Sequence, residues 1–154
     1  MQPAKKTSSQ NQLIAILNQS LASALDLKLQ TKQAHWNVKG ENFIALHELF
    51  DKVASAAEED ADMIAERAVQ LGGIAQGTTQ AIAKQSDLPA YSLTAQNAQQ
   101  HVTALTQALR SVADQAREAI DASDEQGDKV TADLFTEVAR GLDKWRWFVE
   151  SHRK

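Results

Sequence analysis

The chain has 154 residues, which suits a single domain, and its lack of cysteine excludes disulfides and cysteine-based zinc or iron–sulfur sites. It is rich in alanine, glutamine and leucine, and only 5% of its residues are aromatic, a composition that favours helices over strands. With 23% charged and 43% hydrophobic residues, the composition matches neither a disordered nor a membrane protein, and the net charge of −4 argues against a protein built mainly to hold nucleic acid.

Glycine and proline divide the chain into four long stretches with helical periodicity, as the leucines every four residues from Leu13 to Leu29 illustrate. These stretches are residues 11–39, 41–71, 94–124 and 128–151. Ser92 or Thr94 is expected to cap the third helix, and Gly72 to end the second. The segment 78–86 could add a short helix between the second and the third.

The pattern therefore predicts an all-α four-helix bundle with one long middle connection, spanning residues 11–151. Residues 1–10 are expected to form a flexible polar tail, and residues 152–154 a short basic end. The N-terminal segment has no apolar core of the kind a signal peptide needs, which predicts a cytoplasmic protein.

The second helical stretch carries a row of polar side chains one residue along from its apolar stripe. The row consists of His47, Asp51, Ser55, Glu58, Asp62 and Glu66. Steps of three and four place these side chains in one sector of the helix surface. Imidazole and carboxylate without thiolate suit Fe²⁺, Mn²⁺ or Zn²⁺. A single carboxylate pair at this spacing is more often a solvated helix face, so the whole row has to be considered together.

The row is symmetric about one point of the helix. His47 and Asp62 are about 22 Å apart along a continuous helix, so they cannot hold one ion within one chain. The pairs 47/66 and 51/62 nevertheless share a midpoint, among the small residues 54–57. Two copies packed antiparallel there would bring His47 and Asp51 of one chain against Asp62 and Glu66 of the other. The spacing thus predicts two equivalent metal sites that exist only in an oligomer.

His35 is expected to join the same site. It precedes Gly40 by five residues and His47 follows Gly40 by seven, so an antiparallel hairpin places both imidazoles at similar heights. Trp36 follows directly and could lie close to such a site, although packing at an interface explains it as well.

Two segments around these residues resemble the signature of Dps proteins, the DNA-binding proteins from starved cells, also called mini-ferritins. They are AHWNVKGENFIALHELFD at 34–51 and DADMIAERAVQLGG at 60–73. Further matches are LDLKLQTKQ upstream, GTTQAI at 77–82 and TADLFTEVARGLDKWRWFVES at 131–151. The resemblance covers nearly the whole chain except its first residues and the end of the third helix.

The resemblance implies a homo-dodecameric cage of ferritin-like four-helix bundles with ferroxidase activity. Such a cage oxidises Fe²⁺, preferably with hydrogen peroxide, stores the ferric mineral and protects DNA from oxidative damage in the bacterial cytoplasm. The implied iron ligands are His35, His47 and Asp51 of one subunit with Asp62 and Glu66 of its two-fold mate. Zn²⁺ or Mn²⁺ could occupy the same ligands. Trp36 matches a family tryptophan thought to accept oxidising equivalents.

The resemblance also suggests an iron-entry pore and DNA contacts. Family cages have acidic pores lined from the region after the third helix, although a solvated helix end and loop would carry similar charges. The candidate carboxylates there are Asp121, Asp124, Glu125, Asp128 and Asp133. Many relatives bind DNA through lysine-rich tails, but this leader carries only Lys5 and Lys6. The two lysines leave both outcomes open at this point: a cage that binds DNA and associates with the nucleoid, and one that does not.

Three alternatives remain to be compared with this interpretation. A larger ferritin would carry Glu-x-x-His motifs within one bundle, and none of the four histidines has a glutamate three residues before it. A nucleoid-compacting, DNA-binding cage with little or no ferroxidase activity is the main alternative. A plain structural bundle would require the complete ligand set and its symmetry to be coincidental.

Overall fold

The computed structural model describes residues 7–154 as five α-helices. These are α1 (Ser8–Asn37), α2 (Phe43–Gln70), the short α3 (Thr79–Gln85), α4 (Ala98–Glu125) and α5 (Lys129–Glu150). The predicted all-α four-helix bundle with a short extra helix in the middle connection is confirmed. No helix in the described part is long and apolar enough to cross a membrane.

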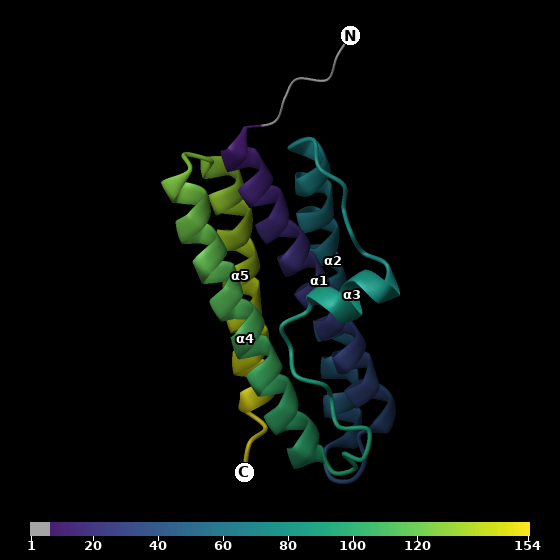
Figure 1. The fold of residues 1–154 in the computed structure, drawn as a ribbon. Coiled ribbons are helices and arrows are strands. Elements are labelled where there is room, and N and C mark those ends of the chain that lie inside the picture. Colours follow the sequence, from purple (N-terminus) through teal and green to yellow (C-terminus); the bar gives the residue numbers. More distant parts are fainter. Residues whose placement is uncertain (1–6) are drawn as a thin grey trace.

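The four long helices form two antiparallel hairpins. Helix α1 packs along α2 and α4 along α5, and the long connection that carries α3 returns the chain from one end of the bundle to the other (Figure 1). The α1–α2 turn, the start of α4 and the C-terminus consequently lie at the same end of the molecule (Figure 1). A parallel bridge between Lys39 and Asn97 joins that turn to the start of α4.

The N-terminal boundary differs from the prediction. Thr7 and Gln10 form a capping box, in which the Thr7 hydroxyl accepts from the Gln10 amide and the Gln10 side chain accepts from the Thr7 amide. This satisfies two backbone donors that a helix start leaves open, so α1 begins at Ser8 and residues 8–10 are not part of a tail. Lys5 and Lys6, the predicted DNA contacts, lie outside the described residues.

The predicted caps of the third long helix are also wrong. Asn97, rather than Ser92 or Thr94, begins α4 through a capping box with Gln100. Ser92 and Thr94 instead bond to each other within the preceding loop, at 3.1 Å between their hydroxyl oxygens. The predicted basic end at residues 152–154 is tied back to the bundle, because the Lys154 amine lies 2.7 Å from Glu41.

Glycines with a left-handed backbone end two of the long helices, as predicted for Gly72. At the end of α2, Gly72 has φ +84°, its amide bonds to Val69 and the amide of Gly73 bonds to Ala68. Gly127, with φ +75°, ends α4 in the same way. Both ends use a pattern that satisfies the last carbonyl groups of a helix and strongly favours glycine.

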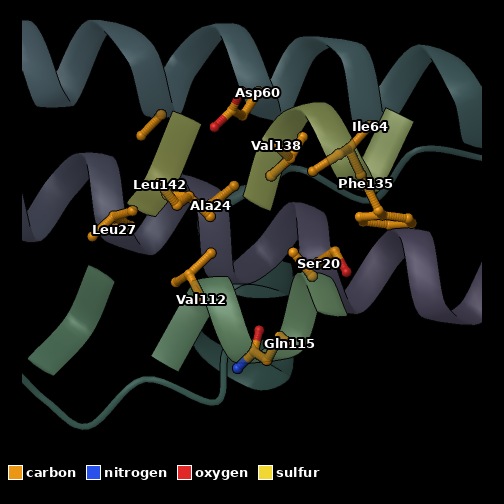
Figure 2. Close-up of a pocket in the computed structure, with 12 residues that line it drawn as sticks. Ser20, Ala24, Leu27, Asp60, Ile64, Val112, Gln115, Phe135, Val138 and Leu142 are labelled. Atoms are coloured by element: carbon orange, nitrogen blue, oxygen red, sulfur yellow. The ribbon is translucent and has the colours of Figure 1, made fainter. Parts of the chain in front are cut away.

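The core is almost entirely aliphatic, with Phe50 and Phe135 as its largest fully buried side chains. At the centre of the bundle lies a cavity of about 10 Å³, with room for about one water molecule. Asp60 of α2, Ser20 of α1 and Gln115 of α4 line this cavity among apolar side chains (Figure 2). Burial, with the nearby charges of Glu137 and Glu59, raises the pKa of Asp60 to about 7.

Candidate metal centre

His35 and His47 meet across the α1–α2 hairpin, as the sequence predicts. Their rings stack with centroids 3.7 Å apart and planes inclined by 17°. His35 comes from the last turn of α1 and His47 from the second turn of α2, and both are half-buried. The ring of Phe43 lies 5.1 Å from that of His47, with the two planes inclined by 35°.

Each histidine is held by the backbone of the other. His35 Nδ1 lies 2.6 Å from the carbonyl oxygen of His47, and His47 Nδ1 lies 2.7 Å from the carbonyl oxygen of His35. Because a carbonyl oxygen only accepts hydrogen bonds, both Nδ1 atoms carry the proton and donate. In the neutral imidazoles the lone pair is then on Nε2, the atom left available to bind a metal ion.

Asp51 extends this pair by one helical turn and is paired with a lysine of α1. Its carboxylate lies 2.7 Å from Lys32 Nζ, and its side chain is half exposed. The hydrogen bond from Lys32 holds the pKa of Asp51 below its usual value, so the carboxylate is charged at neutral pH. Lys32 also lies over the ring of Trp36, 5.8 Å from its centroid, and Trp36 itself is 65% exposed.

Asp62 and Glu66 lie toward the other end of the same face of α2, and both are exposed. Among residues 7–154, no three histidine and acidic side chains of one chain come close enough to hold a metal ion. The structure thus brings His35, His47 and Asp51 to one end of the helix pair and leaves Asp62 and Glu66 away from them. Of the small residues at the midpoint, Ala54 and Ala57 are buried in their own bundle, so Ser55 and the half-buried Ala56 form the accessible part.

The predicted pore carboxylates divide into two groups. Asp121, Asp124, Glu125 and Asp133 are exposed around the end of α4 and the start of α5. Asp128 instead begins α5: its carboxylate accepts from Thr131, and both of its oxygens lie 3.2 Å from Arg67. Burial raises the pKa of Asp128, but the bonds from Thr131 and the charge of Arg67 outweigh it and lower that pKa.

Two features of the structure are not among those that the sequence predicts. The carboxyl of Asp60 faces the central cavity, although Ala57, Asp60 and Ile64 follow helical spacing and could have placed Asp60 among core positions. The second feature is a hydrogen bond of 2.6 Å between Tyr91 of the long connection and His101 of α4. No local pattern indicates it, because it joins a loop to a helix.

Comparison with known proteins places this geometry in a family. A model described as a ferritin-like domain matches residues 14–154. The chain is 49% identical over 146 residues to the DNA protection during starvation protein of Agrobacterium fabrum, covering 95% of this chain and 90% of that relative. The protein of the same name from Mycolicibacterium smegmatis is 36% identical over 137 residues, covering 89% of this chain and 74% of that protein.

Solved structures show the same relationship. The crystal structure of a Dps protein from Bacillus brevis matches with a TM-score of 0.90 at 29% identity, covering 96% of this chain and 98% of that one. A structure of Dps from Mycobacterium smegmatis matches with a TM-score of 0.90 at 33% identity, covering 97% and 91%. The predicted resemblance is confirmed: the chain belongs to the Dps family of ferritin-like proteins.

Proposed function

We propose that this protein is a ferroxidase that oxidises Fe²⁺ with hydrogen peroxide and stores the ferric product inside a cage of twelve chains. Each site takes His35, His47 and Asp51 from one chain and Asp62 and Glu66 from its two-fold mate. The observation that carries this proposal is the stacked histidine pair, because its two Nδ1 donors are bound to carbonyl groups and its two Nε2 atoms remain for a cation.

The residues of the site suit iron as a substrate. Neutral imidazole nitrogen and carboxylate oxygen are ligands that Fe²⁺ accepts, and the carboxylates balance the charge that rises on oxidation. Peroxide takes one electron from each of two Fe²⁺ ions, and its O–O bond breaks to give water with protons from solvent. The same reaction removes both reagents that would otherwise generate hydroxyl radicals, which is how the cage would protect DNA.

The exposed row on α2 supports a site shared between chains. The separation of His47 from Asp62, about 22 Å along one helix, excludes a common ion within a chain, whereas a two-fold axis near Ser55 would join them. The face of α2 from Asp51 to Glu66 is accessible, so a second copy of α2 can pack there. Exposed carboxylates at Asp121, Asp124 and Asp133 fit an entry route for Fe²⁺ into such a cage, and Asp128 is assigned to the structural pair with Arg67.

The activity is tested with the purified protein under anaerobic conditions. Fe²⁺ is added first, then peroxide at less than one equivalent, and the ferric absorbance is followed over time. We expect oxidation to be faster than in buffer by at least about tenfold, since residues that only support the ligands of a metal site typically contribute that much to its activity. An unchanged rate would leave the DNA-binding cage without ferroxidase activity as the function.

DNA binding through the N-terminal leader is the second part of the proposal. Lys154 at the C-terminal end pairs with Glu41 in its own chain, so we assign the DNA contacts to Lys5 and Lys6 of the leader. Several copies on one cage would add avidity, opposed by a net charge of −4 per chain.

We expect the intact cage to retard DNA in a gel at low salt, and the retardation to disappear at physiological salt. Deletion of residues 1–6 should abolish it, whereas Lys154→Gln should leave it unchanged. Retardation that survives the deletion would contradict a role of the leader.

A further inference from the structure

Tyr91, the only tyrosine of the chain, is bound to a buried histidine. Its hydroxyl oxygen lies 2.6 Å from His101 Nδ1, and the two rings lie nearly parallel with planes inclined by 11°. His101 is 1% exposed, and Tyr91 is half-buried. The pair joins the long connection to the first turn of α4.

The protonation states of the pair follow from its surroundings. Burial raises the pKa of the Tyr91 phenol above its usual value, and burial lowers the pKa of His101, so both groups are neutral. The phenol therefore donates to Nδ1, and the second nitrogen of His101, Nε2, carries the other proton. Nε2 has no hydrogen-bond partner within the described structure. The backbone of Ala95 and Asn37 raises the pKa of His101, but by less than burial lowers it.

This arrangement is suited to moving a proton. Oxidised tyrosine loses its phenolic proton readily, so a base within hydrogen-bond distance makes the loss of an electron easier. His101 Nδ1 is that base, and the backbone of Ala95 and Asn37 would stabilise the imidazolium formed.

The pair lies at the end of the bundle that carries the histidine stack. Asn37, which contributes to the environment of His101, is the last residue of α1 and follows His35 by two positions. The bridge between Lys39 and Asn97 fastens the α1–α2 turn to the start of α4, where His101 lies. Figure 1 shows this turn and the start of α4 together at one end.

We propose that Tyr91 is a redox-active residue that gives one electron to peroxide at the iron site, with His101 accepting its proton. The inference rests on the proposed ferroxidase function and adds a second source of electrons. It matters when a site holds a single Fe²⁺, because one ion supplies only one of the two electrons that peroxide needs.

The reaction balances without another reagent. Peroxide receives one electron from Fe²⁺ and one from Tyr91, its O–O bond breaks, and two protons from solvent complete two water molecules. The phenolic proton moves to His101 Nδ1, which leaves a neutral tyrosyl radical beside an imidazolium. A later Fe²⁺ ion returns an electron to the radical, and His101 returns the proton.

The test uses the assembled wild-type protein with one Fe²⁺ per site, mixed with one equivalent of peroxide and frozen at millisecond intervals. Electron paramagnetic resonance should show a tyrosyl radical whose splitting narrows when the protein carries ring-deuterated tyrosine. Tyr91→Phe, which keeps the ring, should lose the signal and release several-fold more hydroxyl radical to a spin trap. Trp36→Phe is the matched control and should retain the tyrosyl signal.

A second variant examines the proton acceptor. His101→Gln keeps a side-chain acceptor but removes the base, so we expect a several-fold lower radical yield at an unchanged rate of iron oxidation with two Fe²⁺ per site. Ferric absorbance is followed in every sample. If the wild type oxidises iron without any tyrosyl signal, or if wild type and Tyr91→Phe release equal amounts of trapped radical, the role of Tyr91 is overturned and the proposed ferroxidase function stands. Failure of the wild type to oxidise iron would overturn this role and the proposed function together.

Discussion

Cages assembled from two inactive variants should regain about a quarter of their iron sites when His47→Ala and Glu66→Ala chains mix at random. Each homogeneous variant should lose at least about tenfold in the rate of iron oxidation, because even residues that only support a ligand typically contribute that much. In a mixed pair, one site combines the intact histidine side of one chain with the intact acidic side of the other. The second site carries both defects.

A matched mixture separates this explanation from a general effect of mixing. His35→Ala and His47→Ala chains both damage the histidine side, so no combination of them restores a site. We expect this mixture to stay as inactive as its components. The rate of ferric absorbance measures recovery, and native mass spectrometry confirms that the chains have mixed. Equal recovery in both mixtures, or none in either, would contradict ligands shared across a two-fold axis.

Replacing Asp60 with asparagine should raise the free energy of unfolding at pH 8. It should also remove the fall of that free energy that the wild type shows as the pH rises toward 7. The folded chain holds the Asp60 proton up to about pH 7, whereas the unfolded chain loses it near 3.8. Between these values the folded state binds more protons, so the free energy of unfolding falls as the pH rises, and it levels off above 7. The two pKa values correspond to a contribution on the order of 4 kcal/mol.

Urea denaturation at fixed protein concentration, from pH 5 to pH 8, measures this difference, because assembly links stability to concentration. Asp114→Asn on the exposed face of α4 is the control and should follow the wild type at every pH. A wild-type profile that remains parallel to that of Asp60→Asn would show that Asp60 is already charged in the folded chain.

The long helices could be predicted from the sequence because each has an apolar stripe with helical spacing and an end marked by glycine. The short helix α3 was predicted within a residue or two as well. The cap of α4 can also be read from the sequence: of the good cap residues Ser92, Thr94 and Asn97, only Asn97 is followed three residues later by a glutamine, Gln100, that completes a capping box. Likewise, Thr7 begins α1 early because Gln10 completes its capping box.

The histidine side of the site followed from hairpin geometry, whereas other contacts depend on positions far apart in the chain. Ala54 and Ala57 looked available to a second helix but face the core, since spacing alone does not say which side of a helix its own bundle covers. The sequence alone places Asp128 among acidic pore residues, because its partner Arg67 lies 61 positions away. The pair of Tyr91 with His101 depends in the same way on tertiary packing.

The reciprocal bonds between His35 and His47 also have a consequence for timing. Because each ring is fixed by the backbone of the other, the nitrogen half of the site is complete as soon as one hairpin has folded. In the proposed shared site, the acidic half arrives only with a second chain. Under the proposed function, a newly made subunit therefore cannot begin oxidising iron on its own, and ferric product forms only where a growing shell is already present to enclose it.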